Sequence, residues 1–222
     1  VVVLDALTYA GRRENLDGVP AKQLTFVHGD IRDPKAVATA MAGCDFVLNF
    51  AAESHVDRSI ETPGEFIQTD VYGVFVLGEE ARRVGVKRFI QVSTDEVYGE
   101  VLEGHSTEEW PLHPRSPYAA SKAGGDRLAY AYHCTYGLPV VVTRCSNNYG
   151  PRQYPEKLVP LFVTNALDKE PLPRHGNGLN PRACRHGCVT CAATPPRLAP
   201  PRLAGATRTL VARRAVQLPG TQ

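Results

Sequence analysis

Carboxylate side chains are missing from the last part of this 222-residue chain, because none follows Glu170. The arginines beyond that point are Arg174, Arg182, Arg185, Arg197, Arg202, Arg208, Arg213 and Arg214. The formal net charge of the whole chain is only +2, so an acidic body is joined to a basic tail. This near-neutral balance gives no indication of nucleic-acid or membrane binding, and the tail has no aromatic residues that could stack on bases.

Long apolar runs and a regular cysteine framework are also absent. Residues 1–4 are apolar, but this run is too short for a signal peptide or a membrane span and stops at Asp5. The six cysteines are irregularly spaced, unlike the disulfide framework of a small secreted domain. We therefore expect a protein of the reducing cytoplasm without membrane association.

A metal site has little support in the sequence. Cys184, His186, Cys188 and Cys191 lie close together, and the last two have the spacing of a zinc half-site. No second pair of this kind follows, and isolated short motifs are poor guides to function. We expect no bound metal.

Short apolar strands alternate with helical patterns through most of the chain, which predicts an α/β fold with a doubly wound parallel sheet. The expected strands are 1–4, 24–27, 46–50, 87–93 and 139–144, and the expected helices are 34–43, 63–83, 116–136 and 156–167. After about residue 180 the periodicity ends, and only 209–216 could form a further element.

Tyr118 and Lys122 form a Tyr-x-x-x-Lys pair within the helix expected over 116–136. The spacing places both side chains on one helical face, one turn apart. An ammonium group beside a phenol favours the phenolate, so we expect Lys122 to lower the pKa of Tyr118 toward neutrality. Such a tyrosine could act as a general base, although the same pair also occurs on ordinary helix surfaces.

Thr94, Asp95 and Glu96 follow directly after the strand expected over 87–93. Ligands of open parallel sheets bind at this end of the strands. Adjacent carboxylates repel each other, so at least one pKa is expected to rise, and one group could then act as an acid and the other as a base. The alternative is a solvated acidic loop, but the position after a buried strand favours function.

Asp5 and Asp30 each follow an expected strand. At the end of the second strand of a dinucleotide-binding unit, a carboxylate bonds the adenosine ribose diol and disfavours a 2′-phosphate. Asp5 therefore indicates NAD rather than NADP, and Asp30 and Ile31 would lie beside the adenine. An ordinary strand-end acid in a turn is the alternative for each.

Six stretches, taken in order, resemble the dTDP-glucose 4,6-dehydratase family of extended short-chain dehydrogenase/reductases, which have an NAD-binding Rossmann fold. The stretches are 5–11, 29–33, 50–59, 93–99, 116–123 and 144–151. The Asp95-Glu96 pair is the most specific part, because related epimerases generally lack it and related decarboxylases usually keep only the glutamate.

The resemblance implies dehydration of dTDP-glucose to dTDP-4-keto-6-deoxyglucose through bound NAD. Tyr118, assisted by Lys122, would remove the proton of the sugar 4-hydroxyl as hydride passes from C4 to NAD. Glu96 would abstract the C5 proton, Asp95 would protonate the leaving 6-hydroxyl, and Thr94 would bind the 4-oxygen.

The resemblance also implies binding residues. Those for NAD are Asp5, Ala6, Leu7, Thr8, Asp30, Ile31, Ala51, Ala52, Glu53, Ser54, Thr69, Tyr118, Lys122 and Asn148. Those for the nucleotide sugar are Ser54, Thr94, Asp95, Glu96, Asn147, Lys157, Leu158 and Arg182. A polar turn is the alternative for Asn147 and Asn148, and we interpret His55 as a hydrogen-bonded structural histidine. Family members form homodimers through two long helices, for which 63–83 and 116–136 are the candidates.

The chain departs from the family at both ends. The family's first strand and its Gly-x-x-Gly-x-x-Gly turn precede the part matched here, so we expect a sheet without one central strand, and poor NAD binding. Near residues 173–183 the family pattern is lost, and we hypothesise a slip of the reading frame, which sequencing of the coding DNA would test. We expect a partial NAD-binding domain over 1–170 and a substrate-domain remnant with a disordered tail over 171–222. The open alternatives are an epimerase or decarboxylase of the same family, and an inactive fragment.

Overall fold

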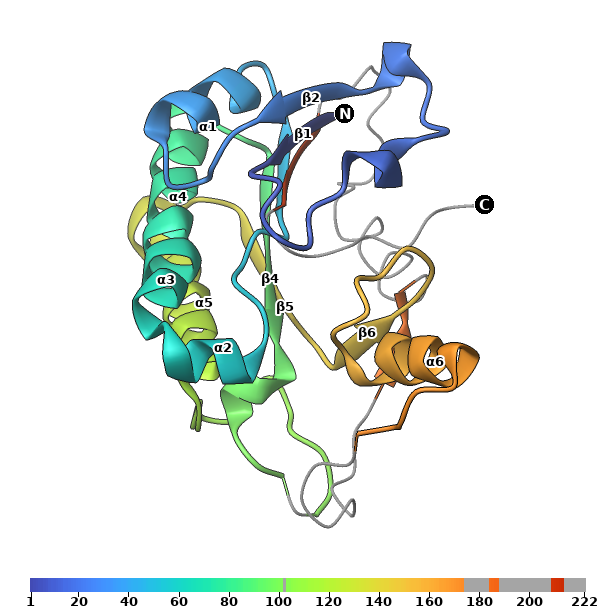
Figure 1. The fold of residues 1–222 in the computed structure, drawn as a ribbon. Coiled ribbons are helices and arrows are strands. Elements are labelled where there is room, and N and C mark those ends of the chain that lie inside the picture. The colour runs from blue at the N-terminus through green and yellow to red at the C-terminus, as the bar shows by residue number, and fades with distance from the viewer. Residues whose placement is uncertain (102, 174–183, 188–208, 214–222) are drawn as a thin grey trace.

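The fold is built on a parallel sheet with the strand order β2-β1-β8-β3-β4-β5 (Figure 1). The computed structural model describes residues 1–101, 103–173, 184–187 and 209–213. The strands of this sheet are β1 (Val2–Asp5), β2 (Thr25–His28), β3 (Phe46–Asn49), β4 (Arg88–Thr94), β5 (Val140–Cys145) and β8 (Thr209–Arg213). A small second sheet pairs β6 (Asn147–Tyr149) with β7 (Cys184–His186). The expected α/β fold with a parallel sheet is confirmed.

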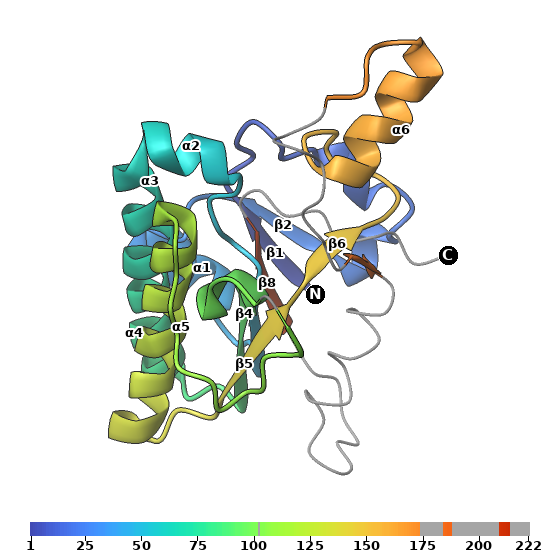
Figure 2. The same ribbon diagram turned by 90° about the horizontal axis from the view of Figure 1, so that it is seen from below.

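Helices cover one face of the large sheet, as Figures 1 and 2 show. The helices are α1 (Pro34–Met41), α2 (Val56–Glu61), α3 (Pro63–Ile67), α4 (Gly73–Val84), α5 (Pro117–Tyr136) and α6 (Leu158–Asp168). Short helical turns are η1 (Arg13–Leu16), η2 (Ala21–Gln23), η3 (Gln68–Tyr72) and η4 (Asp95–Tyr98).

Strands β1 and β3 are buried on both faces, which explains their continuous apolar runs. Val2 and Leu4 belong to the core beneath the helices, whereas Val3 between them faces the opposite core. On that second side, Leu16 and Leu24 pack against Val3 and its neighbours. The 1–4 run is therefore apolar at every position because neither side of β1 meets water.

Local signals set most helix ends. The Asp33 side chain accepts a hydrogen bond from the Lys35 amide at 2.9 Å, with Pro34 opening α1. Ser116 caps α5 in the same way by accepting from the Ala119 amide. Gly85 ends α4 in the left-handed conformation that glycine adopts without strain.

The helix expected over 63–83 contains a π-helical turn, η3, between α3 and α4. Helix α5 lies close against this turn. A Cβ on Gly125 would lie 2.2 Å from the Asp70 carbonyl oxygen, so only glycine permits the approach. The close packing brings the η3 side chains toward the first turns of α5.

The expectation of a sheet without a central strand is wrong. Strand β8 lies between β1 and β3 and pairs in parallel with both, with Val2 beside Leu210 and Phe46 beside Thr209. A β-branched and apolar stretch can complete both ladders because the pairing uses backbone groups. Two strands, β7 and β8, lie in the expected tail, and β8 falls within 209–216, where the sequence left room for a further element.

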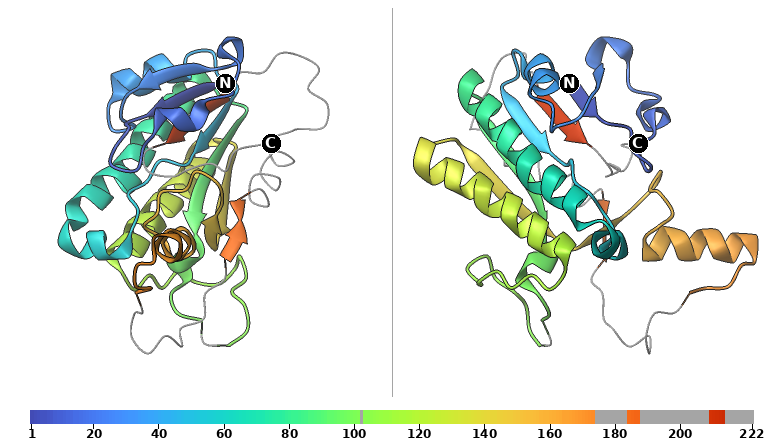
Figure 3. Two further views of the ribbon diagram at one scale, coloured as in Figure 1. Left: turned by 45° about the vertical axis from the view of Figure 1, so that its right-hand side comes forward. Right: turned by 60° about the vertical axis from the view of Figure 1, so that its left-hand side comes forward.

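Helix α6 projects from the rest of the described chain (Figure 3). None of its residues is buried, and the apolar side chains of Leu158, Val163 and Leu167 are exposed. Among the described residues, no helix combines the length and the apolarity needed to cross a membrane.

Candidate active site

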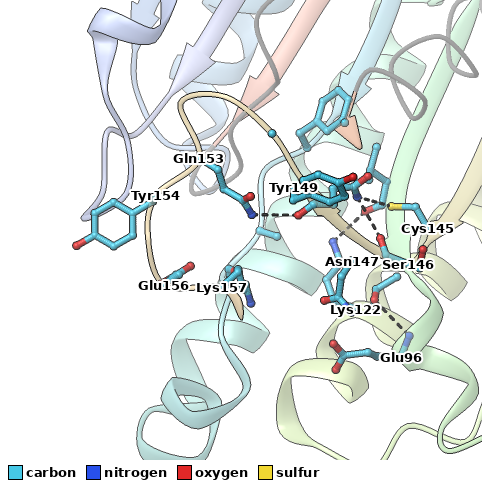
Figure 4. A pocket seen from close by; sticks show the side chains of 18 of the residues that line it. Glu96, Lys122, Cys145, Ser146, Asn147, Tyr149, Gln153, Tyr154, Glu156 and Lys157 are labelled. Carbon is cyan, nitrogen blue, oxygen red and sulfur yellow. Dashed lines mark hydrogen bonds between the residues drawn. The ribbon is translucent and has the colours of Figure 1, made fainter. Parts of the chain in front are cut away.

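A pocket opens at the carboxyl ends of β3 and β4, where open parallel sheets bind ligands (Figure 4). One wall comes from the loop after β3, the end of β4 and the start of α5, and the other from the segment after β5. The expected site residues that line it are Ala52, Glu53, Ser54, Thr94, Glu96, Tyr118, Lys122, Asn147, Asn148 and Lys157. In Figure 4, Glu96 and Lys122 lie on one side and Glu156 and Lys157 on the other.

Tyr118 and Lys122 face this pocket from consecutive turns of α5. The Lys122 ammonium donates to the Val92 carbonyl oxygen at 2.9 Å. The pKa of Tyr118 is raised, chiefly because the phenol is removed from water and also by the charges of Glu96 and Asp70. A hydrogen bond with Thr94 acts in the opposite direction. The expected lowering of the Tyr118 pKa is therefore wrong for the protein as it stands in this structure.

Asp95 and Glu96 begin the 3-10 turn η4, and only Glu96 lines the pocket. Thr94 caps the turn by accepting from the Glu96 amide at 3.2 Å, and its hydroxyl donates to Asp95 at 3.3 Å. Burial raises the pKa of Asp95, against hydrogen bonds from Thr94 and the backbone. A raised carboxyl pKa was expected, but burial is its main cause rather than repulsion by Glu96.

Asp5 ends β1, and Asp30 lies two residues after the end of the neighbouring strand β2. Asp5 is 4% exposed and accepts from the Leu7 amide at 2.8 Å, which shapes the turn through Ala6. Asp30 accepts from the Arg32 amide and pairs with its guanidinium at 3.0 Å. Ile31 is a core residue, 1% exposed. Thr8 lies in the segment that follows β1. None of the residues Asp5, Ala6, Leu7, Thr8, Asp30 and Ile31 lines the pocket.

The loop after β3 is held by buried polar groups. Asn49 accepts from the Ala51 amide, and Asp70 accepts from the Glu53 amide at 2.9 Å. His55 has a φ of 86° and is the N-cap residue that precedes α2. Its Nδ1 has no hydrogen-bond partner among the described residues, so the interpretation of His55 as a hydrogen-bonded histidine is wrong for that nitrogen.

Asp70 is a residue of this region that the sequence did not indicate. It is 2% exposed, and its second carboxylate oxygen accepts from the Ser121 hydroxyl at 2.7 Å. Burial raises the pKa of Asp70 from 3.8 to about 6, while Lys122 and the hydrogen bonds oppose the shift. Thr69 beside it is fully buried in η3. A π-helical turn has no local sequence signal. The one sequence feature that could have indicated Asp70 is its charge within an otherwise apolar helical face.

The segment after β5 forms a strand rather than the alternative polar turn. Asn147 and Asn148 belong to β6, and Asn148 donates to Ser146 at 3.2 Å. Leu158 begins α6 and is 43% exposed, outside the pocket lining. Arg182 lies outside the described residues, so its expected role has no structural counterpart here.

Buried polar atoms in the pocket lack partners within the described chain. They are Ser93 Oγ, Ser146 Oγ and Gln153 Oε1. Burying such atoms without a hydrogen bond is costly, so they fit a polar ligand at the end of β4. Among the described residues, no cluster of His, Cys, Asp and Glu could hold a metal ion, and Cys188 and Cys191 lie outside them.

Comparison with known proteins gives consistent matches. The family model described as GDP-mannose 4,6 dehydratase matches residues 1–191. A dTDP-glucose 4,6-dehydratase of Streptomyces antibioticus is 56% identical over 84% of this chain and 55% of its own length. That of Streptomyces niveus is 51% identical over 87% of this chain and 58% of its own length. The crystal structure of DesIV, a dTDP-glucose 4,6-dehydratase of Streptomyces venezuelae with NAD and TYD bound, superposes with a TM-score of 0.88 at 52% identity, covering 96% of this chain and 66% of that one. The chain thus spans little more than half the length of the curated relatives it matches.

Proposed function

The chain belongs to the nucleotide-sugar dehydratase family that the GDP-mannose 4,6 dehydratase model describes, and from that premise we propose that it acts as an NAD-dependent dTDP-glucose 4,6-dehydratase. The observation that supports this most is one pocket lined by Thr94, Glu96, Tyr118 and Lys122. In such a pocket, Tyr118 with Lys122 would reach the 4-hydroxyl of a hexose, and the Glu96 carboxylate would reach C5 of the same sugar. NAD, when bound, supplies a reversible acceptor for the two electrons that leave C4 and return to C6.

The residues divide the proton transfers between them. Tyr118 takes the 4-hydroxyl proton, Lys122 supports it, and Thr94 binds the 4-oxygen. The raised pKa of Tyr118 means that the phenol needs an additional positive charge nearby before it works as a base near neutrality. Glu96 removes the C5 proton, which the 4-ketone acidifies. Asp95, whose pKa is raised, protonates the leaving 6-hydroxyl, and water departs. As the two electrons return to C6, C5 takes a proton back from Glu96.

The cofactor would lie along the ends of β1 to β4. The residues that would hold it are Asp5, Ala6, Leu7, Thr8, Asp30, Ile31, Ala51, Ala52, Glu53, Ser54, Thr69, Tyr118, Lys122 and Asn148. Asp5 favours the ribose diol of NAD, and Ser93 and Ser146 offer buried hydroxyls at the β4 end. Ser54, Asn147 and Lys157 line the part of the pocket left for the nucleotide sugar, with Leu158 and Arg182 beyond it.

The surface helices suggest a homodimer. Ile67, Tyr72, Phe75 and Tyr130 are large, exposed residues on α3, η3, α4 and α5. We propose that this face pairs with a second copy, because exposed apolar groups of this size mark interaction surfaces. Analytical ultracentrifugation of Phe75→Asp tests it: the variant should sediment as a monomer, and an unchanged dimer would refute the assignment.

Two further proposals concern domain organisation and location. We place a partial NAD-binding domain in residues 1–170 and a portion of the substrate domain in residues 171–222. The described Cys134, Cys145 and Cys184 form no disulfide, which fits a reducing, cytoplasmic setting.

The decisive experiment is incubation of the purified chain with dTDP-glucose and NAD, followed by chromatography of the sugar nucleotides. The 4-keto-6-deoxy product is expected, whereas a C4 epimer or a decarboxylated sugar would identify a different enzyme of the family. Calorimetric titration with NAD separates these from an inactive fragment, since absence of both product and binding would reject the proposal.

A further inference from the structure

A largely buried guanidinium, that of Arg144, joins the elements that carry the proposed catalytic groups. Arg144 lies on β5 opposite Ser93 of β4. Its Nε and Nη2 donate to the two Asp126 carboxylate oxygens at 2.7 and 3.0 Å, and its Nη1 donates to the Tyr98 hydroxyl at 2.8 Å. Asp126 is fully buried, Tyr98 is 8% exposed and the Arg144 side chain is 12% exposed, so most of the network is shielded from solvent.

Each end of this network belongs to a different part of the site. Asp126 lies on α5, one helical turn after Lys122 and two turns after Tyr118. Tyr98 ends the same 3-10 turn that Asp95 and Glu96 begin. A fixed distance from Tyr98 to Asp126 therefore fixes η4 relative to the Tyr118–Lys122 face of α5.

We infer that Arg144 is a positioning residue that sets the distance between the Asp95–Glu96 turn and the Tyr118–Lys122 pair, acting through Tyr98 and Asp126. The inference rests on the proposed function for its chemical consequence. Arg144 does not touch the reacting atoms; it orients the groups that do. The elimination depends on it more than the oxidation, because α5 has its own anchors in the Ser116 cap and in the hydrogen bond from Lys122 to Val92.

Energetics support a positioning role rather than a stabilising one. Moving an arginine and an aspartate out of water costs about as much as their attraction returns, so a buried pair adds little net stability. Its value lies in geometry, since the planar guanidinium binds one carboxylate with two parallel hydrogen bonds and leaves a third direction for Tyr98. Arg127 also donates a hydrogen bond to Asp126, at 2.6 Å, so the carboxylate accepts from two arginines.

The test compares Tyr98→Phe, which removes one hydrogen bond, with Arg144→Lys, which keeps the charge but loses the planar fork. Tyr136→Phe is the matched control, an exposed tyrosine at the other end of α5. The first readout needs neither cofactor nor substrate: amide hydrogen exchange at Gly99, whose amide donates to the Glu96 carbonyl within η4. Both test variants should exchange faster there than the wild type and the control.

The second readout separates the two halves of the reaction. In Tyr98→Phe, loss of the C5 proton and of water should slow by about tenfold or more, from the loss of a hydrogen bond to a charged group. Oxidation at C4 should stay within about twofold, so reduced cofactor accumulates and its near-ultraviolet absorbance rises during turnover.

Two results would overturn the inference: unchanged exchange at Gly99 in both variants, or equal slowing of oxidation and elimination. Absence of product from the wild-type chain would instead reject the proposed function. The exchange measurement would then still decide whether Arg144 fixes η4.

Discussion

The Lys122 ammonium donates its hydrogen bond to the Val92 carbonyl oxygen, 2.9 Å away, and so anchors α5 to the end of β4. Tyr118, one turn earlier on the same helix, is thereby held beside Thr94 and Glu96 in the pocket. The pKa of the phenol is raised in this arrangement, because its burial, together with the charges of Glu96 and Asp70, outweighs the hydrogen bond with Thr94.

Tyr118→Phe tests the role of the phenol as a base. We expect turnover of dTDP-glucose to fall by about a hundredfold to ten-thousandfold, the usual contribution of general acid–base catalysis. Binding of the sugar nucleotide, measured by calorimetry, should change little, since only the hydroxyl is lost. Lys122→Met should lower turnover as well. Near wild-type turnover in Tyr118→Phe would remove this residue from the mechanism.

Glu96→Gln and Asp95→Asn should impair different steps of the elimination. Glu96→Gln cannot remove the C5 proton, so exchange of solvent deuterium into C5 should be lost. Asp95→Asn should keep that exchange but slow the departure of water, because the proton donor is missing. Burial raises the pKa of Asp95, so the acid form persists above the ordinary carboxyl range. The rate of elimination by the wild type should therefore decrease only at a pH above that range, and Asp95→Asn should lose this pH dependence. Identical behaviour of the two variants would contradict the division of roles.

The residues whose positions could be predicted are those with local signals. Ser116 followed by Pro117 marks the start of α5, and Gly85 marks the end of α4, because capping chemistry is local in sequence. The alternation of apolar strands and helices likewise indicates which sheet edge carries Thr94 and Glu96.

Features that depend on distant partners could not be predicted. Nothing around Asp70 shows that it lies in a π-helical turn or that Ser121 and the Glu53 amide contact it. The pairing of β8 between β1 and β3 is equally hidden, since a short apolar stretch does not specify its neighbours. For Tyr118, the sequence indicated the helical neighbour Lys122 but not the Val92 carbonyl that takes its hydrogen bond.

Val211→Pro tests whether β8 completes the sheet. Proline lacks the backbone N–H that a central strand donates and leaves a buried acceptor unpaired, so the free energy of unfolding should fall by about 1–3 kcal/mol. Val211→Ile is the matched control, because it keeps the N–H and a β-branched side chain. Urea denaturation of both variants gives the comparison. Equal stability of the two would show that β8 does not contribute as a paired strand.

Asp70→Asn tests the buried carboxylate through the pH dependence of stability. Burial raises the pKa of Asp70 from 3.8 to about 6, so the folded state disfavours the charged form. The wild type should therefore lose stability relative to Asp70→Asn as the pH rises from about 4 to about 7, by up to about 3 kcal/mol. Lys122 and Glu53, the charged groups that act on Asp70, are unchanged in the variant, and lost hydrogen bonds add only a constant offset.

Asp126→Asn provides a control of opposite sign. The pKa of Asp126 is lowered, because Arg144 and Arg127 outweigh its burial. The folded state therefore favours the charged form, and the wild type should gain stability relative to Asp126→Asn as the pH rises up to the ordinary carboxyl range, with the full gain kept above it. Urea denaturation of the three proteins at several pH values gives both slopes. Parallel slopes for the two variants would show that Asp70 ionises without the cost that its burial implies, so that the Glu53 amide and the Ser121 hydroxyl stabilise a carboxylate there.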